Sequence, residues 1–500
     1  MFKDVVKGVA KNTSIMMFQQ VITWVASLIL MLFLPRYLGP VEYGKLFLAL
    51  SIYEIFRVLV SYGGNFLVAK YVSRDHTATA QIVTDATVLR LLIAALSAAM
   101  LVGAVYLADY PVDTEMTIFA VAIMLVWQGG LTALYAAYQG HEALKFTSFG
   151  AIVERVVISV VGVTSLLLGA GKLVIAMVMS LGNLLNFVSL LAFAPRIIPS
   201  IPRVNWRDVF AQLRSGLPYF LFAVFGTIYN RIDSLMLSKM SPGEVVGWYG
   251  GAFRLFDMMN FLPYILTVAL YPVLSRLGTE SNSIHGRTTQ KGLEIVILAA
   301  FPMTIGVFFF ANDIISLLYS LENYQGSVPI LRILTCGLML LYVDMILVTG
   351  LISSDKQREF SLISLAAIPI KFFLNFVLIN YFQAAANNGG IGAAISTGIT
   401  EGCIMIATLI LLPKVTLSGF RVAVIGKSAV ASALMFGVIW LGWNIGIYWI
   451  ALIPVGAVVY GTMLLLLKTF EPAEMQFLKQ LVAARSLRQL KDLLKQESAG

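Results

Sequence analysis

Seven basic and six acidic residues lie inside long apolar stretches of this 500-residue chain, where a charged side chain is costly. Arginine presents a planar fork of donors that matches phosphate oxygens, and an acid at membrane depth can bind a proton or Na⁺. These residue types predict a site for an anion and a site for a coupling ion. They are Arg57, Arg90, Arg155, Arg231, Arg254, Arg332 and Lys371, with Glu54, Glu154, Asp233, Asp257, Asp344 and Glu401.

Spacing places some of these charges on one face of a helix. Glu54 lies three residues before Arg57, and Arg254 lies three residues before Asp257, so each pair shares a helix face. Two interpretations stay open. Each acid neutralises its neighbouring arginine and holds helices together, or the set lines a central cavity that is modestly cationic.

Composition excludes a soluble enzyme of several domains. The chain is 59% hydrophobic and 12% charged, against about 45–50% apolar and about 25% charged residues in soluble globular chains. Its mean hydropathy is +0.86. An apolar run of roughly 20 residues is enough for one membrane-spanning helix, so the sequence predicts an all-α integral membrane protein without a large soluble domain.

Fourteen apolar runs are long enough to span a membrane as helices. The last two lie close together, so twelve or thirteen spans remain as alternatives. The runs are about 12–34, 42–63, 85–108, 116–138, 147–169, 172–194, 215–238, 246–271, 290–311, 328–352, 360–382, 389–412, 427–444 and 447–468.

The charges between the runs predict how the chain is oriented. With the N-terminus on the cytoplasmic side, the inner segments hold 24 lysines and arginines and the outer loops hold four, namely Arg36, Lys45, Lys172 and Lys239. Such an excess on one side is the positive-inside pattern. It predicts both termini in the cytoplasm of a multi-pass protein of the inner membrane, and it accounts for the net charge of +9 without nucleic acid.

A proline-containing inner linker divides the runs into two sets of six. We expect an N-terminal lobe at 1–194, the linker at 195–214, a C-terminal lobe at 215–412 and a terminal helix pair at 413–470. The remaining 471–500 reads as a basic amphipathic helix, which either docks on membrane lipids or a partner or is simply solvated.

A short internal repeat supports two related lobes. The motif L-G-P-V-E-Y-G at 38–44 resembles M-S-P-G-E-V-V-G at 240–247, and each motif opens the second span of its lobe. The matched residues are Pro40 with Pro242, Glu42 with Glu244, Gly44 with Gly247, and farther along Glu54 with Asp257. Repeated halves are common in secondary transporters, whose substrate site lies between them near the midplane.

The motifs of catalysis and cofactor binding are absent. The sequence has no phosphate-binding loop G-x-x-x-x-G-K-[ST], no serine–histidine–aspartate set and no metal-ligand spacing. Its three histidines, His76, His141 and His285, lie far apart along the chain. We therefore expect no enzyme activity, catalytic residue, metal or cofactor.

Two motifs resemble the oligosaccharide flippases of polysaccharide biosynthesis. They are L-P-R-Y-L-G-P-V-E-Y-G-K at 34–45 and S-Y-G-G-N-F-L-V-A-K-Y-V-S at 61–73. That family is a branch of the multidrug/oligosaccharidyl-lipid/polysaccharide exporter superfamily. The resemblance implies fourteen helices in a V-shaped pair of lobes with a terminal pair. It also implies movement of a polyprenyl-pyrophosphate-linked oligosaccharide, such as an O-antigen, capsule or exopolysaccharide unit, to the outer leaflet.

On this interpretation the basic residues hold the diphosphate and the acids couple transport to Na⁺, H⁺ or the membrane potential. The diphosphate ligands would be Arg57, Arg231 and Arg254, with Arg155 and Lys371 as further candidates. The coupling or charge-pairing acids would be Glu54, Asp233, Asp257 and Glu401. A polysaccharide polymerase and glycosyltransferases would be partners of the same pathway.

Three alternatives remain. A cation-coupled multidrug exporter has the same fold, although such exporters usually stop at twelve spans. The related lipid II flippase carries basic residues on its first helix, whereas the first run here has only Lys11, at its mouth. A membrane-embedded polysaccharide assembly enzyme would leave these charges with a structural role.

Overall fold

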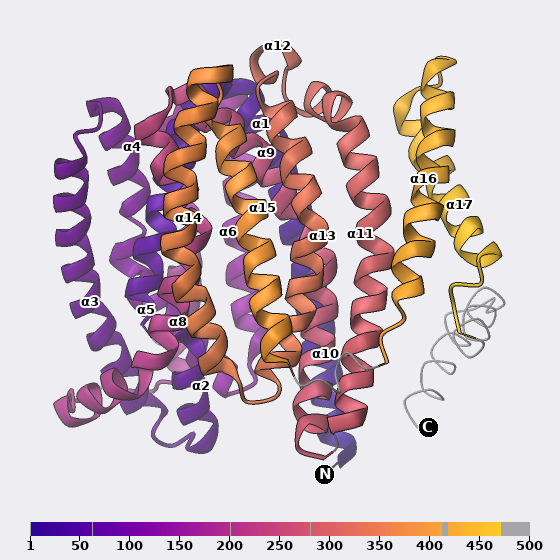
Figure 1. Ribbon diagram of the computed structural model, residues 1–500. Coiled ribbons are helices and arrows are strands. Elements are labelled where there is room, and N and C mark those ends of the chain that lie inside the picture. The colour runs from indigo at the N-terminus through magenta and orange to yellow at the C-terminus, as the bar shows by residue number, and fades with distance from the viewer. Residues whose placement is uncertain (1, 63, 201, 281, 413–418, 472–500) are drawn as a thin grey trace. The chain divides into compact units, whose positions relative to one another are not determined.

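The computed structural model describes residues 2–62, 64–200, 202–280, 282–412 and 419–471. The described residues form helices and loops without a strand (Figure 1). All but the first residue of the predicted tail at 471–500 lies outside them. The helices are α1 (Phe2–Val60), α2 (Gly64–Arg74), α3 (Thr79–Ala108), α4 (Val112–Ala122), α5 (Leu125–Gly140), α6 (Leu144–Leu167), α7 (Lys172–Phe193), η1 (Ala194–Arg196), α8 (Trp206–Met240), α9 (Gly243–Met259), α10 (Phe261–Glu280), α11 (Asn282–Leu318), α12 (Leu321–Tyr324), α13 (Ser327–Ile352), α14 (Gln357–Ala386), α15 (Gly389–Leu411), α16 (Val422–Asn444) and α17 (Trp449–Leu466).

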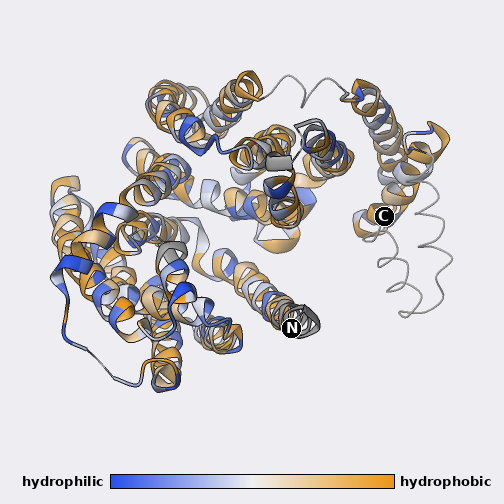
Figure 2. Ribbon diagram, turned by 90° about the horizontal axis from the view of Figure 1, so that it is seen from below, coloured by the Kyte–Doolittle hydropathy of each residue, from blue (hydrophilic) through white to orange (hydrophobic). Residues whose placement is uncertain are grey.

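The described residues hold thirteen candidate membrane spans, and every predicted apolar run overlaps one of them. Hydrophobic residues run along the helices (Figure 2). The first candidate, Ile15–Val60, contains two predicted runs in 46 residues. At 1.5 Å per residue a straight helix of that length would measure about 70 Å, more than twice the roughly 30 Å hydrocarbon core.

A break at Gly39 divides α1 into two crossings. Gly39 has φ 72° and ψ 168°, a conformation that glycine adopts without a steric penalty, and Pro35 and Pro40 flank it. The half before the break runs alongside α6, because Ser159 donates a hydrogen bond to the carbonyl oxygen of Ala26 and Leu30 lies against Gly162 farther along.

The half after the break follows the opposite direction. Lys45 pairs with Asp113 at the start of α4, and Tyr53 donates a hydrogen bond to Gln128 in the following α5. Because α6 returns from α5 after a three-residue turn, the two halves of α1 are antiparallel. The described residues therefore make fourteen crossings, and the predicted fold class of an all-α membrane protein with about fourteen spanning helices is confirmed.

Contacts between loops show which segments share a side of the membrane. One ion-pair cluster joins two lysines, Lys45 and Lys172, with two acids, Glu42 and Asp113. Each lysine pairs with both acids. These residues come from three segments that were all predicted to be outer. Which side faces the cytoplasm stays a prediction.

Two predicted inner loops also meet. The rings of His76 and His141 lie 4.4 Å apart between centroids, and the Nε2 atom of His141 is 2.8 Å from the hydroxyl of Thr79. These two histidines are 65 residues apart in the sequence, and the chain between them returns to the same end of the helices. Burial, and then the charge of His76, lower the pKa of His141 below its usual value.

The helices fall into two compact units. The first unit contains Met1–Met259, Ile314–Leu334 and Gln357–Ala407, and the second contains Asn260–Asp313, Thr335–Lys356 and Thr408–Gly500. The predicted lobe boundaries follow the order of the chain rather than these units, and they stay a prediction.

The second unit holds the terminal pair α16 and α17 against α11. Tyr460 of α17 donates a 2.7 Å hydrogen bond to the carbonyl oxygen of Leu298. Arg421, just before α16, donates through Nε and one terminal nitrogen to the two oxygens of Glu294, at 2.8 and 2.6 Å. Phe309 packs edge-on against Phe436. The terminal pair thus contacts α11 at several positions along that helix.

In the first unit, glycines bring α1 and α9 into backbone contact. A Cβ atom on Gly247 would overlap the carbonyl oxygen of Pro40, and one on Gly44 would lie 2.8 Å from the backbone nitrogen of Gly247. Only a residue without a Cβ fits such a crossing. Gly44 and Gly247 are the glycines matched by the internal repeat, so the two copies of the repeat lie against each other.

We expect Gly247→Ala to lower the free energy of unfolding by about 1–3 kcal/mol, because the added methyl meets backbone that cannot rotate away. The measurement is the melting temperature of the purified protein in detergent. Gly226→Ala in α8 is the control, since no atom lies within 4 Å of a Cβ there. Equal melting temperatures for the two variants would contradict the crossing.

Candidate functional site

A cavity of about 500 Å³ lies within the first unit, between α1 and α5 to α9. Both halves of α1 contribute to it, with Leu30 from the first crossing and Phe47 to Arg57 from the second. A volume in this range is typical of small-molecule sites, which span about 300–1,000 Å³. The cavity is therefore the candidate substrate site.

Four of the five predicted substrate-binding residues line this one cavity. Arg57 comes from α1, Arg155 from α6, Arg231 from α8 and Arg254 from α9. Positions separated by up to 197 residues in the sequence thus meet around a shared space. Their role in binding stays a prediction.

The arginines differ in their partners. Arg57 donates through Nε and a terminal nitrogen to one oxygen of Glu54, at 2.9 and 2.6 Å. Across the residues that the structure describes, Arg155, Arg231 and Arg254 form no ion pair. Arg231 instead lies over the ring of Phe253, 5.9 Å from its centroid. Three guanidinium groups at the cavity therefore keep donors for a ligand.

Three carboxylates line the same cavity. Glu54 and Asp257 are predicted coupling residues, and Glu154 was counted only as an acid inside an apolar run. Four arginines and three carboxylates give the lining a net charge of +1. Internal pairing accounts for Glu54 and Arg57, and the remaining charges favour a modestly cationic cavity.

The fifth predicted basic ligand, Lys371, lies elsewhere in the first unit. Its ammonium group is 2.9 Å from the Oδ2 atom of Asp233 and donates to the carbonyl oxygen of Tyr229 at 3.1 Å. It also lies over the Tyr229 ring, 4.3 Å from the centroid. The Lys371 and Asp233 side chains are 2% and 1% exposed, so this pair is buried between α14 and α8 and does not line the cavity.

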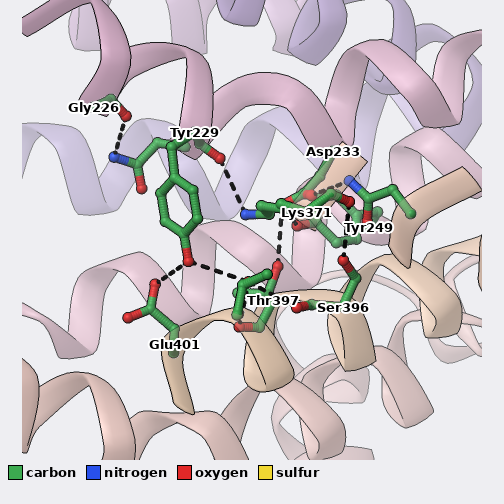
Figure 3. Close-up of polar contacts among 11 residues, drawn as sticks. Gly226, Tyr229, Asp233, Tyr249, Lys371, Ser396, Thr397 and Glu401 are labelled. Atoms are coloured by element: carbon green, nitrogen blue, oxygen red, sulfur yellow. Dashed lines mark hydrogen bonds and ion pairs between the residues drawn. The ribbon is translucent and has the colours of Figure 1, made fainter. Parts of the chain in front are cut away.

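Neutral donors complete the shell around Asp233 (Figure 3). Asn375 donates to Oδ1 at 2.7 Å, while Tyr249 and Thr397 donate to Oδ2 at 2.9 and 3.1 Å. The Asp233 carboxylate on α8 therefore has a cation and three hydrogen bonds from α9, α14 and α15. Such full satisfaction is what a buried ion pair requires to be stable.

Glu401 lies at the edge of the same cluster. It accepts a 2.8 Å hydrogen bond from the hydroxyl of Tyr229, and its side chain is buried. In the described part of the chain it forms no ion pair. Figure 3 shows it on the far side of Tyr229 from Lys371. Lys371 and Asp233 balance each other, so the charge of Glu401 is left without a matching cation.

Neutral polar residues at the cavity were missed by counting charges. Gln128 on α5 and Asn183 and Asn186 on α7 line the cavity with Glu154. Asn183 and Asn186 are three residues apart inside an apolar run, the same spacing that marked the charged pairs. That signal could have identified them from the sequence.

We expect Lys371→Met to lower the free energy of unfolding by about 3–5 kcal/mol, because it leaves the Asp233 carboxylate buried without its cation. Combining it with Asp233→Asn removes that charge, so the double variant should be more stable than Lys371→Met alone. Melting temperatures in detergent give the double-mutant cycle. Strictly additive effects would contradict a direct pair.

Comparisons with known proteins point to membrane transporters. The family model described as "Polysaccharide biosynthesis protein" matches residues 9–278, and the MatE model matches residues 218–377. A probable multidrug resistance protein NorM of Bacillus subtilis is 26% identical over 214 residues, which cover 42% of this chain and 47% of that protein. A probable flippase AglR of Haloferax volcanii is 26% identical over 248 residues, or 48% and 51% of the two chains. The chain spans about half the length of these curated relatives.

Solved structures share the fold over most of the chain. A lipid II flippase MurJ in an inward closed conformation aligns with a TM-score of 0.70 at 16% identity, covering 91% of this chain and 98% of that one. An inward-facing multidrug resistance MATE family transporter aligns with a TM-score of 0.63 at 13% identity, covering 83% and 95%. At these identities the likeness establishes the fold alone, that of a multi-pass membrane protein.

Proposed function

The chain belongs to the polysaccharide biosynthesis protein family, and we propose that it is a flippase for lipid-linked oligosaccharides. It would carry a polyprenyl-(pyro)phosphate-linked oligosaccharide from the cytoplasmic to the outer leaflet for surface polysaccharide synthesis, such as O-antigen, capsule or exopolysaccharide. One observation carries the proposal: Arg155, Arg231 and Arg254 line the cavity without forming ion pairs among the described residues. A diphosphate supplies the acceptors that these guanidinium groups lack.

Different parts of the substrate would then lie in the cavity and in the bilayer. The arginines hold the diphosphate and the polar lining shelters the sugars, while the polyprenyl tail stays in the bilayer. Arg231 and Arg254 come from α8 and α9, and Arg57 and Arg155 from α1 and α6. Alternating access would shift these helices and present the site to one leaflet at a time.

The charge of the lining separates this proposal from its alternatives. A net charge of +1 with three guanidinium groups outside ion pairs opposes a cationic drug, which disfavours the multidrug exporter despite the NorM relatives. Among the residues of the first α1 crossing whose side chains the structure describes, Leu30 lines the cavity and no basic residue does, which disfavours lipid II. The relatives with printed functions are transporters or flippases, which disfavours an assembly enzyme.

The location and partners follow from the same proposal. The chain would lie in the inner membrane with both termini in the cytoplasm, as the 24 to 4 distribution of basic residues predicts. It would act between glycosyltransferases that build the lipid-linked unit and a polymerase that consumes it. Membrane lipids surround it, and nucleic acid is not a partner.

We assign ion coupling to Glu401. Glu54 is paired with Arg57 and Asp233 with Lys371, so those carboxylates are already neutralised. Glu401 is buried with a neutral hydroxyl as its hydrogen-bond partner. Charging a buried acid without a cation is costly, and a bound proton removes that cost.

We expect Arg231→Ala and Arg254→Ala to abolish surface glycan in a deletion strain, because each removes a ligand of the diphosphate. Arg254→Lys should also leave little surface glycan, since an ammonium group cannot form the bidentate contact with phosphate that a guanidinium forms. Glycan display is measured by staining or lectin binding, with membrane levels of each variant checked by immunoblot.

Arg207→Ala is the matched control, because Arg207 is exposed near the start of α8 and does not line the cavity. Normal glycan display in both Arg231→Ala and Arg254→Ala would overturn the substrate role of these arginines. Drug sensitivity of the deletion strain with intact glycan would favour the exporter instead.

A pH gradient imposed on proteoliposomes should accelerate transport of a fluorescent lipid-linked sugar by the wild type. Glu401→Gln should transport at one rate with or without the gradient, because the amide takes up no proton. Glu115→Gln, an acid outside the cavity and the buried cluster, should respond like the wild type. A response retained in Glu401→Gln would contradict the assignment.

A further inference from the structure

Part of the cavity lining forms a neutral and acidic surface distinct from the arginines. It consists of Gln128 on α5, Glu154 on α6, and Asn183 and Asn186 on α7, which we call the amide wall. The three amide side chains are between 2% and 7% exposed. Polar groups so deeply buried need partners, and their hydrogen bonds determine what they can still offer a ligand.

The Glu154 carboxylate is held by both asparagines. Asn183 donates to Oε1 at 3.2 Å and Asn186 to Oε2 at 2.6 Å. Trp127 fixes Asn183 in turn, because its ring nitrogen donates to the Asn183 side-chain oxygen at 2.7 Å. Each Glu154 oxygen has a second lone-pair direction, so the carboxylate is positioned and still able to accept from a ligand.

Gln128 offers the complementary groups. Its side-chain oxygen accepts a hydrogen bond from the hydroxyl of Tyr53 at 3.3 Å. This contact orients the amide and leaves two N–H donors on its nitrogen. No residue in the described ranges accepts from that nitrogen, and Gln128 lines the cavity. The wall therefore presents donors at Gln128 and acceptors at Glu154.

Close packing of α6 and α7 keeps these groups in place. A Cβ atom on Gly182 would overlap the Ile158 side chain, and one on Gly150 would overlap the Asn186 side-chain oxygen. The two helices approach so closely that Glu154 reaches across to α7. A wall that is rigid before binding loses less entropy when a ligand is ordered on it.

From this geometry we infer that the amide wall is a carbohydrate subsite, which binds hydroxyl groups of the sugar attached to the diphosphate and contributes to glycan selectivity. The inference rests on the proposed function. A sugar hydroxyl both donates and accepts, which matches a fixed carboxylate beside an amide. The Glu154 carboxylate repels phosphate, so the wall and the arginines bind different parts of one head group. A cavity of about 500 Å³ holds both subsites together.

The test compares two kinds of probe on the purified full chain in nanodiscs. One is undecaprenyl diphosphate without sugar, and the other is the same carrier bearing glucose, galactose, N-acetylglucosamine or N-acetylgalactosamine. We expect the wild type to bind at least one sugar-bearing probe more tightly than the bare carrier. Glu154→Ala and Gln128→Met should each remove about tenfold of that added affinity, the effect of one charge-assisted or buried hydrogen bond. Gln128→Met should not change binding of the bare carrier, and Glu154→Ala should not weaken it.

Gln139→Met is the matched control for Gln128→Met. Gln139 lies on the same helix, is exposed and does not line the cavity, so its replacement should leave both affinities unchanged. Glu154→Gln keeps the volume of the side chain and removes its charge. A melting temperature like that of the wild type, together with weaker binding of the sugar-bearing carrier, would show that binding and not folding is lost.

Equal loss for bare and sugar-bearing carriers in Glu154→Ala would overturn the subsite, as would a wild type that binds no sugar-bearing carrier better than the bare one. The proposed function fails differently. In that case Arg231→Ala and Arg254→Ala would leave binding of the bare carrier unchanged, whatever the amide wall does.

Discussion

The cost of placing a charge at membrane depth governs the interior of this protein. An isolated basic or acidic residue at the centre of a spanning helix costs about 2.5–3.5 kcal/mol on insertion scales. The first unit meets this cost in two ways. Lys371 and Asp233 are enclosed and paired, and Asp233 accepts three further hydrogen bonds, whereas Arg155, Arg231 and Arg254 border a cavity.

The two arrangements have opposite physical consequences. The enclosed pair is bonded to four helices, so moving any one of them breaks hydrogen bonds and exposes a charge. It therefore resists change and fixes α8, α9, α14 and α15 together. Arg155, Arg231 and Arg254 have donors left over and come from α6, α8 and α9. A small shift of one helix changes the spacing between guanidinium groups and so changes how well they match one anion.

The sequence could predict the fold and the cavity arginines, because both depend on local patterns. Apolar length marks each span, and a spacing of three puts Arg57 beside Glu54 and Arg254 near Asp257. It could not separate Lys371 from the cavity set, because its partner Asp233 lies on another helix, 138 residues earlier. A count of charges does not include neutral side chains, and it therefore missed Gln128, Asn183 and Asn186. The meeting of His76 with His141 likewise depends on how the chain returns.

The attachment of the terminal pair constrains how such proteins can gain or lose helices. Glu294 on α11 is 4% exposed and is neutralised chiefly by Arg421, which precedes α16. A chain that ended after α15 would keep Glu294 without that guanidinium, next to Lys291 alone. Removing one partner of a largely buried ion pair is destabilising, because the other charge stays desolvated. Loss of the terminal pair would therefore call for a compensating change on α11, at or near position 294.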